Sequence, residues 1–375
     1  MNWDQIETEW QAMTRRVRSD WPDMMQSGPD EDPPTQPPGD LPAPDVWADT
    51  APIRADLFGI ERLEHHALSL AAAQSVSQGR PLVVANLIGR VKANAKVLLS
   101  AYQAGARSLD VGQQITPAAE WLLDNFHIVE QQLRQIEDDL PPGYYRHLPK
   151  LADGPFAGYP RVLGLTWAFV AHTDSLLTEA VLLRYVQAYQ SVQPLTIGES
   201  WAVAITLRIV LIENMRRLAV QITEGQVLRQ AADEIVDQVL TAKASGGSAH
   251  AVLARLDRSD LPEIMAAQIA KRLRGTDPAE TPLAGWLEGR LLQLGLTVDA
   301  VVSNAQTRQG ASNVTMRNIV TSLRQMSEMD WADFFEAASL VEVRLRAQPG
   351  YGEMDFAART GYRTPIETLA RHSDH

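Results

Sequence analysis

The chain contains no cysteine among its 375 residues. This absence excludes disulfide bonds, thiolate metal sites and a cysteine nucleophile, because each of these needs a sulfhydryl side chain. A protein without cysteine is compatible with a reducing compartment. The amino terminus also lacks the basic segment followed by an apolar run that is typical of a secretory signal.

Long apolar runs and a basic charge balance are missing as well. The strongest apolar segment extends only from Trp201 to Ile212 and is interrupted by Arg208, whereas a membrane-spanning helix needs about 18–20 apolar residues. The 46 aspartates and glutamates outnumber the 34 lysines and arginines, which gives a net charge of −12. An acidic surface disfavours nucleic acid and anionic membranes. We therefore expect a soluble cytoplasmic chain, whose association with a membrane would come through a partner or through missing sequence.

Familiar catalytic and cofactor-binding patterns are also absent. The sequence has no GxxxxGK[ST] phosphate loop, no GxGxxG after a strand and no GxSxG nucleophile turn. No His-x-x-x-His or Glu-x-x-His pair occurs among His65, His66, His127, His147 and His172, although such spacing is typical of zinc and di-iron sites. We therefore expect neither a metal nor a cofactor.

Composition divides the chain into four segments. Residues 1–25 predict an amphipathic helix with a tryptophan-rich face, and residues 26–50 form a Pro-rich linker that we expect to be flexible and disordered. The rest has the apolar periodicity of helices, with a first subdomain over 51–225 and a second over 226–375. No alternating pattern typical of a strand persists. The predicted fold is therefore all-α, a multi-helix bundle or an irregular α-solenoid.

Capping residues and Pro/Gly breaks give the helix boundaries. Thr116 predicts a helix start, because Pro117 behind it suits the first helical position. Thr196 and Glu199 form a Thr-x-x-Glu capping box before a strongly apolar helix. Asn313 or Ser312 is predicted to cap the helix at 314–328, and Asp330 the helix at 331–347. The predicted helices cover residues 57–76, 82–105, 117–138, 159–172, 178–191, 197–222, 226–243, 248–257, 260–273, 281–295, 297–309, 314–328, 331–347 and 364–371.

The best candidate for a site is the corner at residues 141–161, PPGYYRHLPKLADGPFAGYPR. Loops between helices carry function more often than cores do, and tyrosine rings can stack on sugar rings while guanidinium groups bind their hydroxyls. The alternative is a structural corner, in which proline and glycine set the backbone and the tyrosines cover the helix ends. The candidate glycan or partner contacts are Tyr144, Tyr145, Arg146, His147, Lys150, Asp153, Tyr159 and Arg161.

Charged residues also interrupt the predicted helix 197–222. Because a charge on a buried helix needs a partner, Arg208 and Glu213 predict a buried arginine–glutamate network with a structural role. A catalytic carboxylate pair is the alternative, since glycoside chemistry uses two carboxylates. Spacing alone selects no such pair from the 46 acidic residues, so no catalytic residue is assigned.

Several long, gapless blocks carry a resemblance to a known family. They are TPAAEWLLDNFHIVEQQ, DLPPGYYRHLPKL, GPFAGYPRV, FVAHTD, AYQSVQPLTIGESWAVAITLRIVLIENMRRLA and NVTMRNIVTSLRQMSEMDWADFFEAASLVE. With these blocks, residues 57–373 resemble the amino-terminal region of the cyclic β-1,2-glucan synthases. Separately, the opening MNWDQIETEW gives residues 1–24 a resemblance to the small CsbD-like stress-response proteins.

The first resemblance implies a role in glucan synthesis. Complete members of that family are very large inner-membrane proteins that polymerise glucose from UDP-glucose, and their catalytic domains follow the matched region. This chain ends at His375, so the resemblance transfers no catalytic residue to it. We expect a non-catalytic helical module or fragment that scaffolds the remaining domains of a membrane-bound synthase or contacts β-glucan. The alternative is an independent interaction or stress-related protein that docks onto a separate protein partner.

Overall fold

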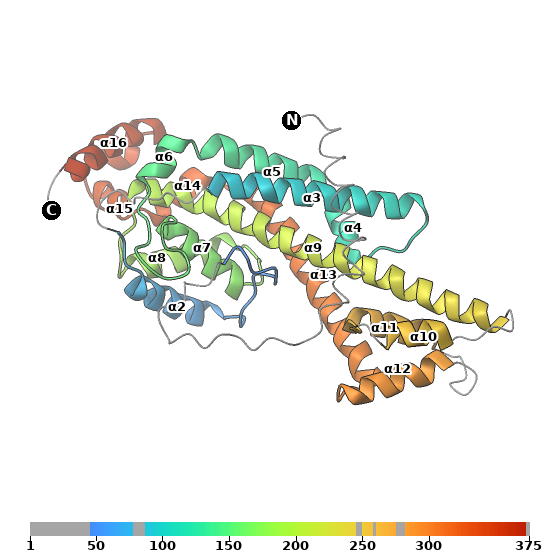
Figure 1. The fold of residues 1–375 in the computed structure, drawn as a ribbon. Coiled ribbons are helices and arrows are strands. Elements are labelled where there is room, and N and C mark those ends of the chain that lie inside the picture. The colour runs from blue at the N-terminus through green and yellow to red at the C-terminus, as the bar shows by residue number, and fades with distance from the viewer. Residues whose placement is uncertain (1–45, 78–86, 245–249, 258–259, 275–281, 373–375) are drawn as a thin grey trace. The chain divides into compact units, whose positions relative to one another are not determined.

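The computed structural model describes residues 46–77, 87–244, 250–257, 260–274 and 282–372. Within these ranges the protein consists of α-helices and one short 3-10 helix, with isolated β-bridges but no strand (Figure 1). The predicted all-α fold is confirmed. The predicted helix at 1–25 and most of the Pro-rich segment at 26–50 lie outside the described residues. No helix in the described part of the chain is long and apolar enough to cross a lipid bilayer.

The chain divides into two compact units that alternate along the sequence. Among the described residues, the larger unit takes residues 46–220 and 313–372, and the smaller unit takes residues 221–312. Two long helices, α9 (Ile197–Ala244) and α13 (Val298–Glu328), each contribute residues to both units.

The larger unit contains most of the helices. Within it, α2 packs against α7 and α8, α3 packs against α4 and α5, and α14 packs against α8 and α15. Besides its parts of α9 and α13, its elements are α2 (Ile60–Ala73), α3 (Leu87–Asp110), α4 (Pro117–Asp124), α5 (Phe126–Asp139), α6 (Pro142–His147), α7 (Arg161–His172), α8 (Glu179–Gln190), α14 (Trp331–Ala338), α15 (Leu340–Arg346), the 3-10 helix η1 (Tyr351–Glu353) and α16 (Phe356–His372).

The first half of α9 forms the centre of the larger unit. Every residue from 202 to 219 is buried. Apolar residues predominate in this stretch and point to all sides of the helix, and its charged residues Arg208 and Glu213 are paired with other elements. Helices α3 and α5 lie beside it (Figure 1), and the hydrogen bonds Asn94–Glu213 and Gln132–Arg208 join them to it.

A tight turn between α7 and α8 joins distant segments of the larger unit. Asp174 and Ser175 have φ angles of 49° and 64°, in the left-handed region that is costly for residues other than glycine. The Asp174 carboxylate accepts hydrogen bonds from Thr315 Oγ1 at 2.6 Å and Arg54 Nε at 3.1 Å. Ser175 Oγ accepts one from Asn214 Nδ2 at 2.8 Å. These bonds hold the turn against the segment before α2, against α9 and against α13.

The smaller unit consists of the second half of α9, α10 (His250–Leu256), α11 (Glu263–Arg272), α12 (Pro282–Gln293) and the first half of α13. Ion pairs at its surface, such as Arg272–Asp237, are largely exposed, and such pairs contribute little to stability. The unit therefore depends on its apolar core, which is formed by Ala232, Ile235, Val236, Val239, Leu256, Met265, Ala266, Ala267, Ile269, Leu273, Leu283, Leu287, Leu291 and Val301.

The structure confirms the helix starts predicted at Thr116, Thr196 and Asp330, whereas the start predicted at Asn313 or Ser312 is wrong because α13 continues through it. Thr116 Oγ1 accepts a hydrogen bond from the backbone N–H of Ala119 at 3.3 Å, at the start of α4. At the start of α9, Thr196 Oγ1 accepts from the N–H of Glu199 at 3.1 Å, and the Glu199 carboxylate accepts from the N–H of Thr196 at 2.9 Å. These reciprocal bonds are those of a capping box.

Two predicted helix breaks are wrong. The helices predicted at 197–222 and 226–243 form the single helix α9, and those at 297–309 and 314–328 form the single helix α13. Gly225 interrupts the sequence pattern of α9, but one glycine costs only about 1 kcal/mol in a helix. A Cβ atom at this position would lie 3.3 Å from Arg229 Nη1 and 3.5 Å from Ile264 Cδ1, so side chains of the smaller unit surround the glycine.

Other predicted helices are divided or incomplete. The helix predicted at 117–138 is divided at Asn125 into α4 and α5, and that predicted at 331–347 is divided at Ser339 into α14 and α15. Ser339 Oγ accepts from the N–H of Glu342 at 3.2 Å and so starts a new helix. Short polar side chains compete in this way with the backbone bonds of a helix. The sequence also did not predict α6 or the first turns of α16.

Replacing Thr196 with alanine tests the capping box. The N–H of Glu199 would lose its acceptor, so we expect the free energy of unfolding to fall by about 1 kcal/mol. Urea denaturation followed by circular dichroism measures this change. Thr321→Ala, at an exposed position of α13, is the matched control and should stay within about 0.5 kcal/mol of the wild type. An unchanged T196A midpoint would show that the hydroxyl does not cap the helix.

Candidate functional site

The corner at 141–161 is organised around the side chain of Lys150, which is 3% exposed. Its amino group donates to the carbonyl oxygens of Tyr145 and Leu148 and lies 4.3 Å from the centre of the Tyr145 ring. Burial lowers the pKa of Lys150 to about 8, although the charge of Glu199 acts in the opposite direction. Lys150 therefore supports the corner from inside.

Arg161 joins the corner to the start of α9. Its Nε and Nη2 atoms donate to the two carboxylate oxygens of Glu199 at 2.8 Å and 2.6 Å, and its Nη1 donates to Gln193 Oε1 at 2.6 Å. Both members of the ion pair are buried. Because Glu199 also belongs to the capping box, one carboxylate fixes both the corner and the first turn of α9.

The remaining candidate residues form an outer rim of the corner. Arg146, His147 and Asp153 are exposed, and Tyr144 and Tyr159 are half-buried. The structure thus separates the eight candidates into these five rim residues and a buried group. The buried group is Tyr145, Lys150 and Arg161.

Two neighbouring tyrosines of the corner have different surroundings. Tyr145 is buried at 7% exposure and packs against Lys150. The hydroxyl of Tyr144 donates to the carbonyl oxygen of Gly198 at 2.5 Å, in the first turn of α9. The ring of Tyr144 is therefore held at the edge of the corner by a specific polar contact.

Tyr159 belongs to an aromatic cluster that the sequence analysis missed. The ring centre of Trp47 lies 5.6 Å from that of Tyr159 and 5.4 Å from that of Trp167, and Phe156 lies 5.1 Å from Trp167. All four rings are half-buried. Trp47 falls in the predicted linker 26–50, where a single tryptophan outside a periodic pattern gives no sign of its contacts.

The carboxylate of Glu213 lies in a second buried site, which we call the Glu213 cluster. It accepts hydrogen bonds from Arg90 Nη2 at 2.8 Å, Asn94 Nδ2 at 2.8 Å, Arg216 Nη2 at 2.6 Å and Arg217 Nε at 2.9 Å. Burial alone would raise the pKa of Glu213, but the hydrogen bonds from the three arginines outweigh it and hold this pKa below its ordinary value.

Arg208 does not contact Glu213. Its Nε donates to Gln132 Oε1 at 3.0 Å, and its Nη1 lies 3.5 Å from the carboxylate of Asp139. Residues five apart on a helix do not share a face, so the two charges meet different neighbours. Both take part in buried polar networks, but the two networks are separate.

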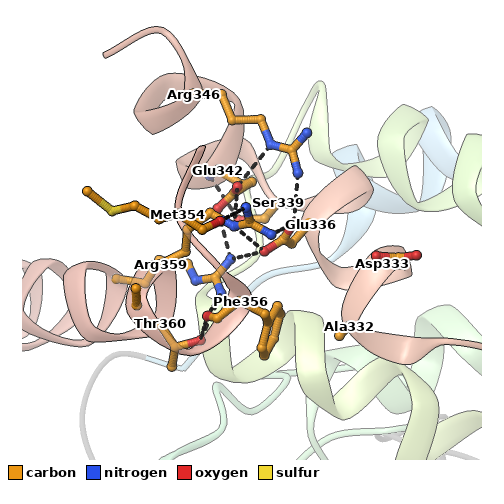
Figure 2. Close-up of polar contacts among 12 residues, drawn as sticks. Ala332, Asp333, Glu336, Ser339, Glu342, Arg346, Met354, Phe356, Arg359 and Thr360 are labelled. Carbon is orange, nitrogen blue, oxygen red and sulfur yellow. Dashed lines mark hydrogen bonds and ion pairs between the residues drawn. The ribbon is translucent and has the colours of Figure 1, made fainter. Parts of the chain in front are cut away.

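A third cluster joins α14, α15 and α16, and its residues converge on two buried carboxylates (Figure 2). Arg346 contacts Glu336 at 2.7 Å and Glu342 at 2.9 Å, and Arg363 bridges the same two glutamates at 3.1 Å and 2.8 Å. Arg359 contacts Glu336 at 2.8 Å. No pattern in the sequence indicates this cluster, because an isolated glutamate on a short helix resembles a solvated one.

The chemistry of these carboxylates is that of structural ion pairs. A general acid at neutral pH needs a raised pKa. The pKa of Glu336 is instead held below its ordinary value, because bonds from Arg359, Arg363 and Arg346 outweigh the raising effect of burial, and Glu213 behaves in the same way. Among the residues that the structure describes, no three His, Asp or Glu side chains are placed to hold a metal ion.

Comparison with known proteins connects the chain to one enzyme. Over 323 residues, the chain is 35% identical to the cyclic beta-(1,2)-glucan synthase NdvB of Rhizobium meliloti (strain 1021). The resemblance to the cyclic β-1,2-glucan synthases is confirmed. The aligned part makes up 86% of this chain but 11% of NdvB, so the chain corresponds to a small part of that synthase.

Two further comparisons concern the whole chain and its first residues. No protein-family model matches the chain. The resemblance of residues 1–24 to the CsbD-like proteins has no support, and these residues lie outside the described part of the structure.

Replacing Glu213 with glutamine tests the Glu213 cluster. The change keeps the size of the side chain but leaves three guanidinium groups without their shared carboxylate, so we expect the free energy of unfolding to fall by about 3–5 kcal/mol. Urea denaturation measures the loss. Glu137→Gln is the control, because this side chain is 50% exposed and 3.7 Å from Lys92 Nζ; it should lose less than about 1 kcal/mol. Equal losses of unfolding free energy in the two variants would contradict the stabilising role of the Glu213 cluster.

The Glu213→Gln variant should also change the pH dependence of the unfolding free energy. The pKa of Glu213 lies below the ordinary value of 4.5 in the folded protein, so its stabilising effect is complete above pH 4.5 and is lost as the pH falls through the folded pKa. Between about pH 5.5 and 3.5, unfolding free energy should fall more steeply in the wild type than in E213Q. Glu336 is present in both proteins, so the difference isolates Glu213. Parallel slopes would contradict the lowered pKa.

Proposed function

We propose that the chain is a non-catalytic helical module that serves the synthesis of cyclic β-1,2-glucan. The observation that carries this proposal is the 35% identity to NdvB over 86% of the chain. Identity at this level over most of a chain indicates a common fold, and the matched part of the synthase offers the most direct guide to a role. The module would act together with the parts of a synthase that this chain does not match.

Buried ion pairs support a scaffolding role. Glu199, Glu213 and Glu336 each bind arginines from other elements of the larger unit. Removal of one member of such a pair leaves an uncompensated charge, so the helices resist displacement from one another. We propose that this body holds the remaining domains of a membrane-bound glucan synthase, at the cytoplasmic face of the inner membrane.

The rim of the corner is the surface that we propose to contact β-glucan or a partner domain. Arg146, His147 and Asp153 are exposed and offer donors and acceptors to sugar hydroxyls. The half-buried rings of Tyr144 and Tyr159 offer apolar faces beside them. The residues that support this rim from inside are Tyr145, Lys150 and Arg161.

Exchange of segments tests the module role. We expect an NdvB variant that lacks the segment aligned with this chain to make no cyclic glucan, and a variant that carries this chain in its place to recover production. An unrelated helical domain of similar length in the same position is the control and should not restore production. Cyclic glucan extracted from cells gives the measurement. Full production by the deletion variant would contradict the proposal.

A double substitution tests the rim. Arg146→Ala with His147→Ala removes two exposed side chains without opening the core, so we expect the protein to fold and its apparent affinity for β-1,2-glucan to fall about tenfold, equivalent to 1.4 kcal/mol. Migration in native gels that contain the glucan measures this affinity. The matched control is Lys92→Ala with Glu137→Ala, an exposed pair on α3 and α5. Equal retardation of both double variants would contradict a contact at the rim.

A further inference from the structure

The Glu213 cluster carries more positive charge than its neighbours balance. One buried carboxylate faces the guanidinium groups of Arg90, Arg216 and Arg217. In the described part of the chain, a further carboxylate that contacts these arginines is that of Asp49, which is 3.8 Å from Arg217 Nη1 and 64% exposed. Water screens an exposed partner at this distance, so the cluster keeps an excess of about two positive charges.

Two other buried ion clusters do not show this excess. Arg161 and Glu199 form a one-to-one pair. The cluster in Figure 2 sets three arginines against two glutamates, and one of the three, Arg346, is 53% exposed. Its additional charge is therefore solvated, whereas the side chains of Arg216 and Arg217 are 10% and 2% exposed.

Two polar atoms beside Glu213 have no partner among the described residues. They are Nε of Arg216, a residue with 8% exposure, and Oδ1 of Asn94, a residue with 1% exposure. Both residues bind Glu213 through their other polar atoms, so the unused donor and the unused acceptor border the same carboxylate. A buried polar group without a partner is destabilising, and native structures usually satisfy it.

Arg90 gives this cluster access to solvent. Its side chain is 24% exposed, and it donates to Glu213 Oε1, as Arg216 does. The two guanidinium groups therefore lie next to each other. Arg90 also donates to the carbonyl oxygen of Trp47 at 3.1 Å and lies 5.2 Å from its ring. Arg90 is the more exposed of the two arginines, and Arg216 is the more deeply buried.

We propose that the Glu213 cluster binds a tetrahedral oxyanion of the phosphoryl class. A phosphoryl dianion matches the excess charge, and its oxygens accept the strong, directional hydrogen bonds that guanidinium groups donate. Asn94 Oδ1 can accept from a hydroxyl of the ligand. Two sources carry this group, a soluble phosphate ester and the headgroup of an anionic lipid. This site uses none of the rim residues, so it extends beyond the proposed glucan role and can fail without affecting it.

Binding of inorganic phosphate to the full chain tests the site. Isothermal titration calorimetry at constant ionic strength should show saturable binding to the wild type. Arg90→Gln and Arg216→Gln should each raise the dissociation constant at least tenfold. Arg184→Gln is the matched control, because Arg184 is a 47% exposed arginine that is paired with Glu64; it should stay within twofold of the wild type. Circular dichroism checks the fold of each variant, and the partly exposed Arg90 decides the question if R216Q does not fold.

Two additional measurements separate the sources of the phosphoryl group. Glycerol 3-phosphate represents soluble esters, and vesicles of phosphatidylglycerol, compared with phosphatidylcholine, represent lipid headgroups. Binding of the soluble ester without vesicle binding assigns a soluble ligand. Vesicle binding that R90Q abolishes and free phosphate displaces assigns a headgroup. No saturable binding by any of the three probes, or equal binding by R90Q and the wild type, would overturn the proposal.

Discussion

The larger unit depends on one constraint: a helix that is buried on every side still carries charged side chains. α9 brings Glu199, Arg208 and Glu213 into the interior, and each needs a partner from another element because an unpaired buried charge is costly. The partners come from the corner before α7, from α5 and from α3. Such pairs add little to the free energy of unfolding, but they favour one packing arrangement of the helices over others. The bidentate contact of Arg161 with Glu199, for example, forms in only a few relative orientations of the two side chains.

Local signals in the sequence predict the fold class and the helix starts. The capping box at Thr196 is correct because all of its atoms lie within four residues. Continuity of the long helices could not be predicted, because it depends on contacts across the fold. Asn313 resembles a helix cap in the sequence, yet its Oδ1 accepts from the N–H of Ala118, and α13 continues through it. Ser339 shows the opposite case, since its hydroxyl starts α15 where apolar periodicity predicts one helix.

The residues of the candidate site can be predicted from the sequence, but the burial of each side chain cannot. Adjacent tyrosines show the difference: Tyr145 is buried, whereas Tyr144 is half-buried at the rim. Sequence spacing also suggested that Arg208 and Glu213 belong together, and only their surroundings place them in separate networks. Trp47 and the glutamates of Figure 2 were missed because their partners lie far away in the sequence. The tertiary fold, and not the spacing in the sequence, decides which residue pairs with a buried charge.

The enclosure of Lys150 makes the corner observable by chemistry. The chain has five lysines, and acylating reagents modify only an amine that is both uncharged and accessible. Because burial lowers its pKa to about 8, Lys150 has a larger uncharged fraction near neutral pH than an ordinary lysine, but its 3% exposure denies the reagent access. Modification of this amine therefore has to wait for a local opening of the corner. The labelling rate at Lys150, read by mass spectrometry, would report how often this corner opens locally.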